Sequence, residues 1–262
     1  MCLLVFAVNA HPRYRLILAG NRDEFHKRAT APAQWWNGQP AMLAGRDIEA
    51  GGTWLGIDGY GRFGAVTNIR DIKPAPAGAP SRGGLVTEFV QGDLNAERFL
   101  AKLRARSQQF AGFNLVLGDQ KGVHFFNNRS GNETKLTDGV YGLSNDRLDT
   151  PWPKVVKATA RVRELLKEDE PDEAALFDVF ADRGIAPDAS LPDTGVGLEF
   201  ERMLSACFIV SPLYGTRSTT VIRVGYEGQA RFCERQFDVD GEMSGQRDFD
   251  FMTISGDREQ PV

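Results

Sequence analysis

Apolar runs of strand length stand near both ends of the chain, and helical periodicity is confined to its middle. Two runs open the sequence at 2–8 and 15–21, and the short His-Pro turn between them predicts two neighbouring strands. Further hairpins are expected at 52–68 and 113–128. Four more strands are expected in the last third of the chain, at 206–211, 218–224, 230–237 and 249–255.

The middle of the chain carries the apolar spacing of amphipathic helices. Residues 83–92 and 95–110 keep their apolar side chains on one side, and Asn95 is a suitable N-cap for the second segment. A third helix is expected to begin at Thr150-Pro151, and a fourth is expected over 172–181. The proline-rich segment 71–82 offers little that can pack, so we expect an exposed loop or lid there.

The order of these elements constrains the fold class. Strands come first, helices follow and strands return, which favours an α+β fold over a doubly wound βαβ sheet. The returning strands have two possible places, beside the first strands in one sheet or facing them in a second layer. The sequence has no internal repeat and no segment typical of a linker, so we expect a single domain over residues 1–262.

The composition and net charge indicate which kinds of binding partner to expect. With 42% hydrophobic and 25% charged residues, the chain has the composition of an ordinary globular protein. Its net charge of -4 gives no electrostatic reason to expect nucleic acid or an anionic membrane surface as a partner. The densest basic run, at 102–106, lies among helix-forming residues and is expected to be a solvated helix face. A small-molecule substrate or ligand is the expected partner.

Targeting and membrane signals are lacking in the sequence. No run approaches the roughly 20 apolar residues that span a bilayer. The apolar run Leu3 to Val8 has no basic segment before it and no small-residue cleavage site after it, unlike a secretory signal. We therefore expect a cytoplasmic protein without a transmembrane segment.

Three cysteines are too few and too widely spaced for a disulfide framework or a zinc site. Cys207 and Cys233 stand in expected strands and are predicted to be core residues. The three histidines do not have the spacing of metal ligands. We expect neither a metal nor another cofactor.

Cys2 follows the initiator methionine directly. Removal of Met1, which is usual before a small second residue, would leave the thiol and a free α-amine on one residue. Their pKa values, near ~8.5 and ~8, allow the amine to act as general base for its own thiol. The alternative is a small buried hydrophobe that begins a strand.

Polar residues Asn21, Arg22, Asp23 and Glu24 end the second expected strand. If the first two strands pair through their short connection, this cluster returns to the chain terminus. An arginine there can stabilise a thiolate, and a carboxylate can bind a terminal ammonium group. The alternative is an ordinary charged turn.

Several motifs occur in order along almost the whole chain. They are MCLL at the start, NRDEF at 21–25, GGTWLGI at 51–57, RFGAVTNIR at 62–70, YGLSN at 141–145, Trp152-Pro153-Lys154, and YGTRSTTV at 214–221. Together they resemble the family that is named for its Asn-Arg-Asp-Glu motif, also called the transport and Golgi organisation family.

This resemblance implies a branch of the N-terminal nucleophile hydrolase superfamily, with a four-layer αββα sandwich of antiparallel sheets. The branch is similar to choloylglycine hydrolases and penicillin acyltransferases, which cleave or transfer amides through an N-terminal cysteine. Carried over to this sequence, the resemblance makes Cys2 the nucleophile and Asp23 the group that holds the terminal amine. Asn68 and Asn145 would position the amine and form the oxyanion hole, and Arg217 corresponds to a late arginine of the same site.

One position departs from the bile-salt enzymes that the family resembles. Their arginine stands three residues before the aspartate, where this chain has Gly20, and here Arg22 is adjacent to Asp23. Because neighbouring strand residues point to opposite faces, Arg22 and Asp23 are expected to face opposite ways. Arg22 remains a candidate catalytic residue, in a role that need not be that of the bile-salt arginine.

Two functions remain open at this level. The first is an enzyme, an amidohydrolase or acyltransferase that acts on a small amide, thioester or acylated compound through Cys2. The second, also implied by the resemblance, is a non-catalytic protein that binds or carries lipid, acyl-coenzyme A or haem. Trp35-Trp36 and Trp54 either line an apolar ligand pocket or pack in the core.

Overall fold

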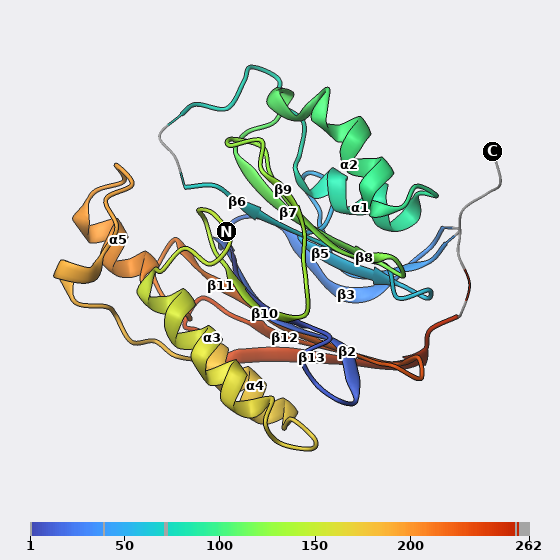
Figure 1. The fold of residues 1–262 in the computed structure, drawn as a ribbon. Helices are drawn as coiled ribbons and strands as arrows, with labels where there is room; N and C mark the ends of the chain where they lie inside the picture. The colour runs from blue at the N-terminus through green and yellow to red at the C-terminus, as the bar shows by residue number, and fades with distance from the viewer. Residues whose placement is uncertain (1, 39, 71–72, 255, 257–262) are drawn as a thin grey trace.

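In the computed structural model, which describes residues 2–38, 40–70, 73–254 and 256, two antiparallel sheets lie face to face (Figure 1). The first sheet has the strand order β10 (Gly139–Leu143), β1 (Cys2–Val8), β2 (Tyr14–Phe25), β11 (Tyr214–Gly225), β12 (Gln229–Phe237) and β13 (Met243–Met252). The second sheet has the order β3 (Thr30–Trp36), β4 (Met42–Asp47), β5 (Leu55–Asp58), β6 (Phe63–Asn68), β7 (Phe113–Asp119), β8 (Gly122–Asn127) and β9 (Glu133–Lys135).

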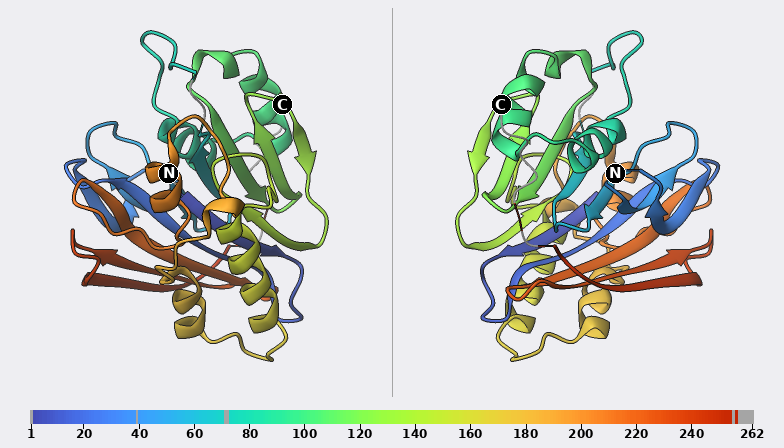
Figure 2. Two further views of the ribbon diagram at one scale, coloured as in Figure 1. Left: turned by 90° about the vertical axis from the view of Figure 1, so that its left-hand side faces the viewer. Right: turned by 90° about the vertical axis from the view of Figure 1, so that its right-hand side faces the viewer.

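Helices cover the outer face of each sheet (Figures 1 and 2). Helices α1 (Gly83–Gln91) and α2 (Ala96–Arg104) pack on the second sheet, and α3 (Pro153–Leu165) and α4 (Glu173–Phe180) pack on the first. The layers therefore follow the order α, β, β, α, which confirms the predicted four-layer sandwich. A short helix, α5 (Leu198–Leu204), lies at one end of the molecule, at the left of Figure 1.

Strand β1 shows why the first apolar run has no polar positions. Leu4, Phe6 and Val8 belong to the core between the two sheets. The alternate residues, Leu3, Val5 and Ala7, belong to the core under α3 and α4. Side chains alternate across a strand, so coverage of both faces favours apolar residues at every one of these positions.

Most predicted elements are confirmed, and their ends are set by local chemistry. The Asn95 side chain accepts a hydrogen bond from the Arg98 backbone N–H, as expected for the N-cap of α2. Helix α3 begins with Pro153 at its first position, three residues later than expected. The returning strands β11, β12 and β13 join the first sheet, which decides between the two alternatives above.

Some predictions were wrong. Residues 206–211 are not a strand, although Cys207 is buried as expected. The second helix ends at Arg104 and is followed by a short 3₁₀ turn, Ser107–Gln109. The sequence also gave no indication of β3, β4, β9, β10 or α5. Ser255, the end of the last expected strand, lies outside the described residues.

No helix in the described part of the chain is long and apolar enough to cross a membrane.

Candidate active site

The β1–β2 ladder brings the polar cluster back to the start of the chain, as predicted. In this antiparallel pair the backbone of Cys2 stands opposite that of Arg22. On its other side β2 pairs with β11, where Asp23 stands opposite Thr216. The side chain of Cys2 lies outside the described residues.

Arg22 faces the space between the two sheets. Its side chain is buried, its guanidinium lies 4.4 Å from the centre of the Trp54 ring, and its Nη1 donates a hydrogen bond of 3.1 Å to Thr30 Oγ1. It lines a cavity of about 560 Å³ together with Asn68. Arg22, a candidate site residue, therefore projects toward this cavity.

Gly20, the position that holds an arginine in the bile-salt enzymes, cannot carry a side chain here. A Cβ atom at Gly20 would stand 2.6 Å from the Leu3 carbonyl oxygen and 2.4 Å from a Leu4 methyl group. A Cβ atom does not make non-bonded contacts this short, so the surrounding atoms exclude any residue larger than glycine at this position.

Asp23 lies on the opposite face of β2, fully buried. Its Oδ1 accepts a hydrogen bond of 2.7 Å from the Thr216 hydroxyl. Burial raises the pKa of the Asp23 carboxyl, and the positive charge of Lys154 opposes this rise. Asp23 is thus a carboxylate held in an apolar layer beside a buried cation.

Lys154 is a site residue that our reading of the sequence did not assign. It stands in the first turn of α3 and is only 3% exposed. A cation is unfavourable at a helix N-terminus, so the nearby Asp23 charge is needed to compensate it. The signal was present in the motif Trp152-Pro153-Lys154.

Asn68 and Asn145 meet at the end of β6. The Asn145 Nδ2 donates a hydrogen bond of 2.8 Å to the Asn68 carbonyl oxygen, and its Oδ1 accepts one of 2.9 Å from the Ser144 hydroxyl. Asn145 is fully buried, whereas Asn68 is half-buried. Within the described chain the Asn68 side chain has no hydrogen-bond partner, so its amide is available to a ligand.

Arg217 is not brought to the same cavity as Asn68. Its Nη1 donates hydrogen bonds to the carbonyl oxygens of Phe25, His26 and Arg28, at 3.2, 3.0 and 3.4 Å. It lines a neighbouring cavity of about 490 Å³, and Trp54 borders both spaces. Arg217 therefore fixes the chain that follows β2, at the side of the site.

Two cavities meet at the candidate site. The larger, of about 560 Å³, is bordered by Arg22, by Trp54 and by part of the proline-rich loop that the sequence predicted as a lid. The smaller, of about 240 Å³, is bordered by Asn145 and by apolar side chains of α5. Phe25 and Asn68 line both cavities, so the available amide of Asn68 stands at their junction.

The tryptophan residues divide between the two alternatives. Trp54 lines the cavities, whereas Trp36 packs in the core under α1 and α2. Trp35 is exposed at 38% and contacts Phe251 edge to face.

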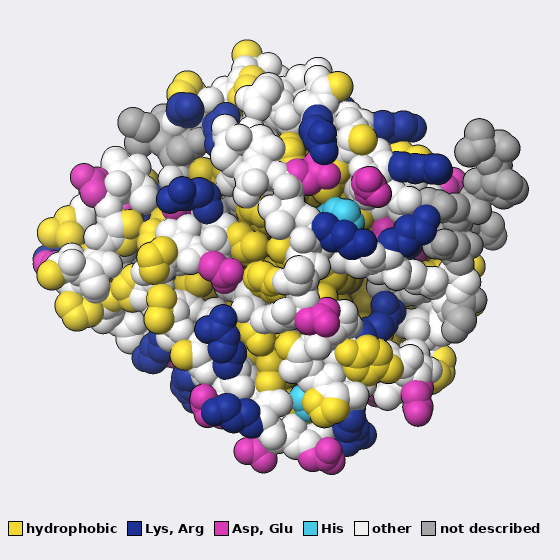
Figure 3. All heavy atoms as spheres, viewed as in Figure 1, with side chains coloured by type: hydrophobic (Ala, Val, Ile, Leu, Met, Phe, Trp, Pro, Cys, Tyr) yellow, Lys and Arg dark blue, Asp and Glu magenta, His cyan; other side chains and the backbone are white. Residues whose placement is uncertain are grey.

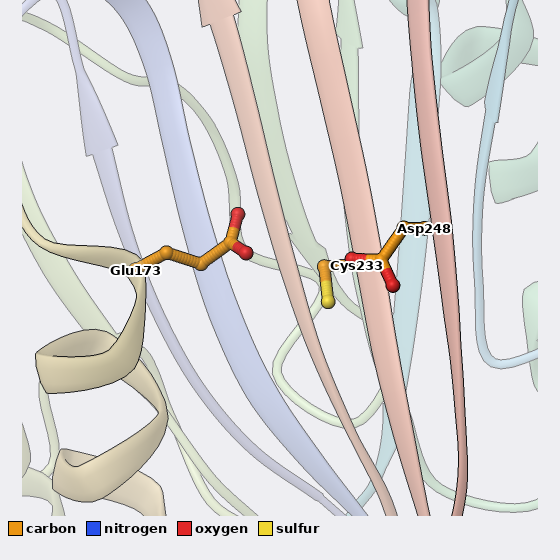
Figure 4. Close-up of side chains that lie close together, drawn as sticks. All are labelled: Glu173, Cys233 and Asp248. Carbon is orange, nitrogen blue, oxygen red and sulfur yellow. The ribbon is translucent and has the colours of Figure 1, made fainter.

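A separate group of potential metal ligands lies between the start of α4 and strands β12 and β13 of the first sheet. Figure 4 shows Glu173, Cys233 and Asp248, whose ligand atoms lie within 4.8 Å of one another. The Arg231 guanidinium donates hydrogen bonds to both carboxylates, at 2.5 and 2.8 Å to Glu173 and at 2.8 Å to Asp248. Since a cation already bridges the two acids, this group is explained as an ion-pair cluster.

Comparison with known proteins shows the family to which the chain belongs. The family model described as Transport and Golgi organisation 2 matches residues 1–239. The chain belongs to this family. It is 36% identical to the human Transport and Golgi organization protein 2 homolog, over 93% of this chain and 95% of the human protein. It is 28% identical to Transport and Golgi organization protein 2 of Drosophila melanogaster, over 89% of this chain and 91% of the fly protein.

Solved structures with distant similarity complete the comparison. One is a Caenorhabditis elegans N-acylethanolamine-hydrolyzing acid amidase ortholog, with a TM-score of 0.47, 9% identity, and coverage of 84% of this chain and 92% of that chain. Another is a mutant conjugated bile acid hydrolase from Clostridium perfringens, with a TM-score of 0.46, 9% identity, and coverage of 100% and 99%.

Proposed function

We propose that this chain is an amidohydrolase or acyltransferase whose nucleophile is the thiol of Cys2 and whose substrate is a small acylated or amide compound. The observation that carries the proposal is the β1–β2 register. It sets the Cys2 backbone opposite Arg22, at a cavity where the Asn68 amide is available to a ligand. A nucleophile, a cation and an oxyanion donor are then within one site.

The reaction needs Met1 to be removed first. The α-amine of Cys2 takes the thiol proton, and the sulfur attacks the substrate carbonyl carbon to form a C–S bond. The amine passes the proton to the leaving nitrogen as the C–N bond breaks. Water, or an acceptor amine or alcohol in a transferase, then attacks the acyl-thioester, and the thiol is regenerated.

The surrounding groups have matching tasks in this proposal. The Asn68 side-chain N–H donates to the oxyanion, a contact whose loss typically lowers the rate about 100- to 1000-fold. Asn145 acts as a positioning residue, because its amide holds the Asn68 backbone. The positive charge of Arg22 favours the thiolate form of Cys2. Asp23, buried on the other face of β2, supplies negative charge for the terminal ammonium.

The test combines mass spectrometry with trapping of the acyl-enzyme. The intact mass should lack Met1, and an activated acyl ester should add one acyl group to Cys2 at neutral pH. Cys2→Ala should abolish this addition, whereas the matched variant Cys207→Ala should leave it unchanged. Burial raises the pKa of the Cys207 thiol to about 11, so this group stays protonated and unreactive. A mature protein that keeps Met1 would rule out the terminal-amine mechanism.

A second function, non-catalytic binding of a lipid, acyl-coenzyme A or haem, is supported by the apolar lining of the smaller cavity. This proposal predicts that Cys2→Ala binds the acyl compound as tightly as the original chain and that neither protein turns it over. Equilibrium dialysis with a radiolabelled acyl compound measures the first point, and product analysis measures the second.

A further inference from the structure

We infer, on the basis of the proposed function, that the substrate is an amphiphile with its apolar acyl chain beside α5 and an anionic leaving group beside Arg22. The inference comes from the different chemistry of the two cavities that share Asn68 and Phe25. It names a substrate class and the direction in which the substrate lies.

The smaller cavity is suited to a hydrocarbon chain. Its walls are formed mainly by apolar side chains: Phe25, Ile69, Phe200, Met203, Leu204 and Tyr214. Its volume of about 240 Å³ would hold roughly 8 methylene groups, if each takes about the volume of a water molecule, ~30 Å³. An acyl chain of medium length fits this space.

Two of the residues that line this cavity are also exposed to solvent. Phe25 is 50% and Phe200 is 59% exposed, and Leu198 and Leu213 are also exposed on neighbouring segments. Figure 3 shows hydrophobic side chains gathered over α5, at the left of the view. An acyl chain that enters the cavity would remove part of this apolar area from water, which favours binding.

Helix α5, which forms part of the smaller cavity, is joined by hydrogen bonds to the residues around Asn145. The Arg70 Nη1 donates a hydrogen bond of 2.5 Å to Glu201 Oε2, and the two side chains are only 8% and 4% exposed. The Arg70 backbone N–H donates to the Asn145 carbonyl oxygen at 2.7 Å. Arg70 thus links α5 to Asn145, the residue whose amide holds the Asn68 backbone, so the chain pocket is tied to the junction of the two cavities.

The larger cavity is suited to an anion. Arg22 is 4% exposed, and in the described part of the chain Thr30 Oγ1 is its one side-chain hydrogen-bond acceptor, with no ion pair formed. The buried carboxyl groups of Glu234 and Asp23 interact with Arg22 through their charges but form no ion pair with it. A carboxylate or similar anion of the ligand would supply the direct contact that the buried guanidinium lacks. Arg28, which lines the same cavity, already pairs with Asp47 at 2.8 Å.

The position of Asn68 between the two cavities determines the direction in which the substrate lies. The oxyanion donor Asn68 must contact the scissile carbonyl, so the acyl chain extends into one cavity and the leaving group into the other. Because the acyl group is the part retained on Cys2 in the proposed reaction, the anion belongs to the amine that leaves.

Three matched amides test the inference: N-octanoylglycine, its neutral analogue N-octanoylglycinamide, and N-acetylglycine. We expect kcat/KM for N-octanoylglycine to exceed both others by at least tenfold. Phe200→Ser should lower the value for the octanoyl amide roughly tenfold more than the value for N-acetylglycine, because it removes contacts to the acyl chain. The matched control is Val156→Ser, which removes an exposed apolar residue of α3 that lines neither cavity.

The charge preference is tested by a ratio. Arg22→Gln should bring the kcat/KM ratio of N-octanoylglycine to N-octanoylglycinamide close to one, and Arg22→Lys should keep part of the preference. A general loss of activity moves both substrates equally and leaves this ratio unchanged. Arg98→Gln on α2, an exposed arginine, should keep the original ratio.

The outcomes separate the inference from the proposed function. Hydrolysis that is indifferent to chain length or to charge overturns the inference and leaves the proposed function standing. Absence of hydrolysis, together with binding to Cys2→Ala in the same order of preference, supports the inference and overturns the function. If the α5 surface instead covers a second copy of this chain, sedimentation would show a dimer that Phe200→Ser dissociates, which would also overturn the inference.

Discussion

Three consecutive polar residues of β2 enter two different environments. The Asn21 amide donates hydrogen bonds of 2.8 Å to the carbonyl oxygens of Phe180 and Cys207, and so ties the outer layer to the sheet. Arg22 points between the sheets, toward Trp54. Asp23 returns to the outer layer, beside Thr216. On the outer face of β2 the motif thus stabilises the packing of the outer layer, and on the inner face it places a cation at the cavity.

Asp23 and Lys154 should be coupled in stability. Asp23→Asn removes the buried negative charge that compensates Lys154, so we expect the free energy of unfolding to fall by about 3–5 kcal/mol. Lys154→Met should have a similar cost, and the double variant should lose clearly less than the sum. Urea unfolding measures this cycle. Asp178→Asn, an exposed acid on α4, is the control. Additive losses would contradict the coupling.

The alternation of strand side chains predicted correctly that Arg22 and Asp23 face opposite ways, but it did not say which of them reaches the cavity. A period of two separates neighbours but does not say which face is the inner one. The inner face is the one that contacts Trp54, which directly precedes β5, and Thr30, which begins β3. Neither contact can be read from the sequence of β2 alone. Lys154 was missed for the same reason, since its partner is distant in sequence.

His124 should make the protein sensitive to acid. It is 7% exposed on β8, and burial lowers its pKa, with Lys135 acting in the same direction and Asp119 opposing. The unfolded chain, in which the pKa returns to its usual ~6.5, therefore binds more protons as the pH falls. Stability contributed by neutral His124 should be present above this value and lost as the pH decreases through the lower pKa of the folded state.

The measurement is the urea midpoint at pH 8 and at pH 5.5. We expect His124→Asn to reduce the difference between the two midpoints, and Lys135→Gln to reduce it in part. An unchanged difference in His124→Asn would assign the acid sensitivity to other groups.

At the scale of whole elements, helices with clear caps were the easiest to predict. The beginnings of α2 and α4 follow from the N-caps Asn95 and Asp172, whose side chains accept backbone hydrogen bonds. The wrong strand at 206–211 is instructive. The Phe208 N–H donates to the Asp182 carbonyl oxygen and the Ile209 N–H to the Thr216 hydroxyl, so the segment covers the sheet with its own hydrogen bonds. An apolar run alone does not distinguish such a covering segment from a strand.

Helix α5 should depend on its buried ion pair. Glu201 accepts hydrogen bonds from Arg70 and from the Thr194 backbone N–H, and the Arg70 Nε and Nη2 atoms have no hydrogen-bond partner in the described chain. Glu201→Gln leaves the buried Arg70 cation without its anion, so we expect a loss of about 3–5 kcal/mol. The double variant Arg70→Met with Glu201→Leu should recover much of that loss.

Hydrogen exchange locates the effect. In Glu201→Gln the amides of α5 should exchange faster, whereas those of α1 should keep their rates. Glu199→Gln, which changes an exposed acid of the same helix, is the matched control. Equal acceleration in both helices would indicate global destabilisation and contradict a local role.

At the scale of the molecule, the inner face of the first sheet is shared with the second sheet, and strands β1, β2 and β11 are also covered on their outer face by α3 and α4. Phe6, Leu18 and Phe232 of the first sheet pack in one core with Ile57 and Val116 of the second. The order of strands and helices along the chain predicted the class, α+β, and the family resemblance supplied the four layers. Composition and periodicity alone left the placement of the returning strands open, because either position buries the same apolar faces.

This shared core leads us to propose that residues 1–262 unfold as one domain. Trp36 reports on the layer under α1 and α2, and Trp152 reports on the layer under α3 and α4. Single-tryptophan variants that keep one or the other should give the same urea midpoint.

Phe6→Ala extends the test to the core between the sheets. Phe6 is fully buried and stacks on Tyr141, with 5.6 Å between ring centres, so its truncation should cost about 3–5 kcal/mol. Both fluorescence probes should report the same shift, since neither sheet keeps its inner face covered without the other. Val156→Ala on the exposed side of α3 should leave both midpoints in place. A shift seen by one probe alone would divide the chain into two folding units and overturn the single-domain proposal.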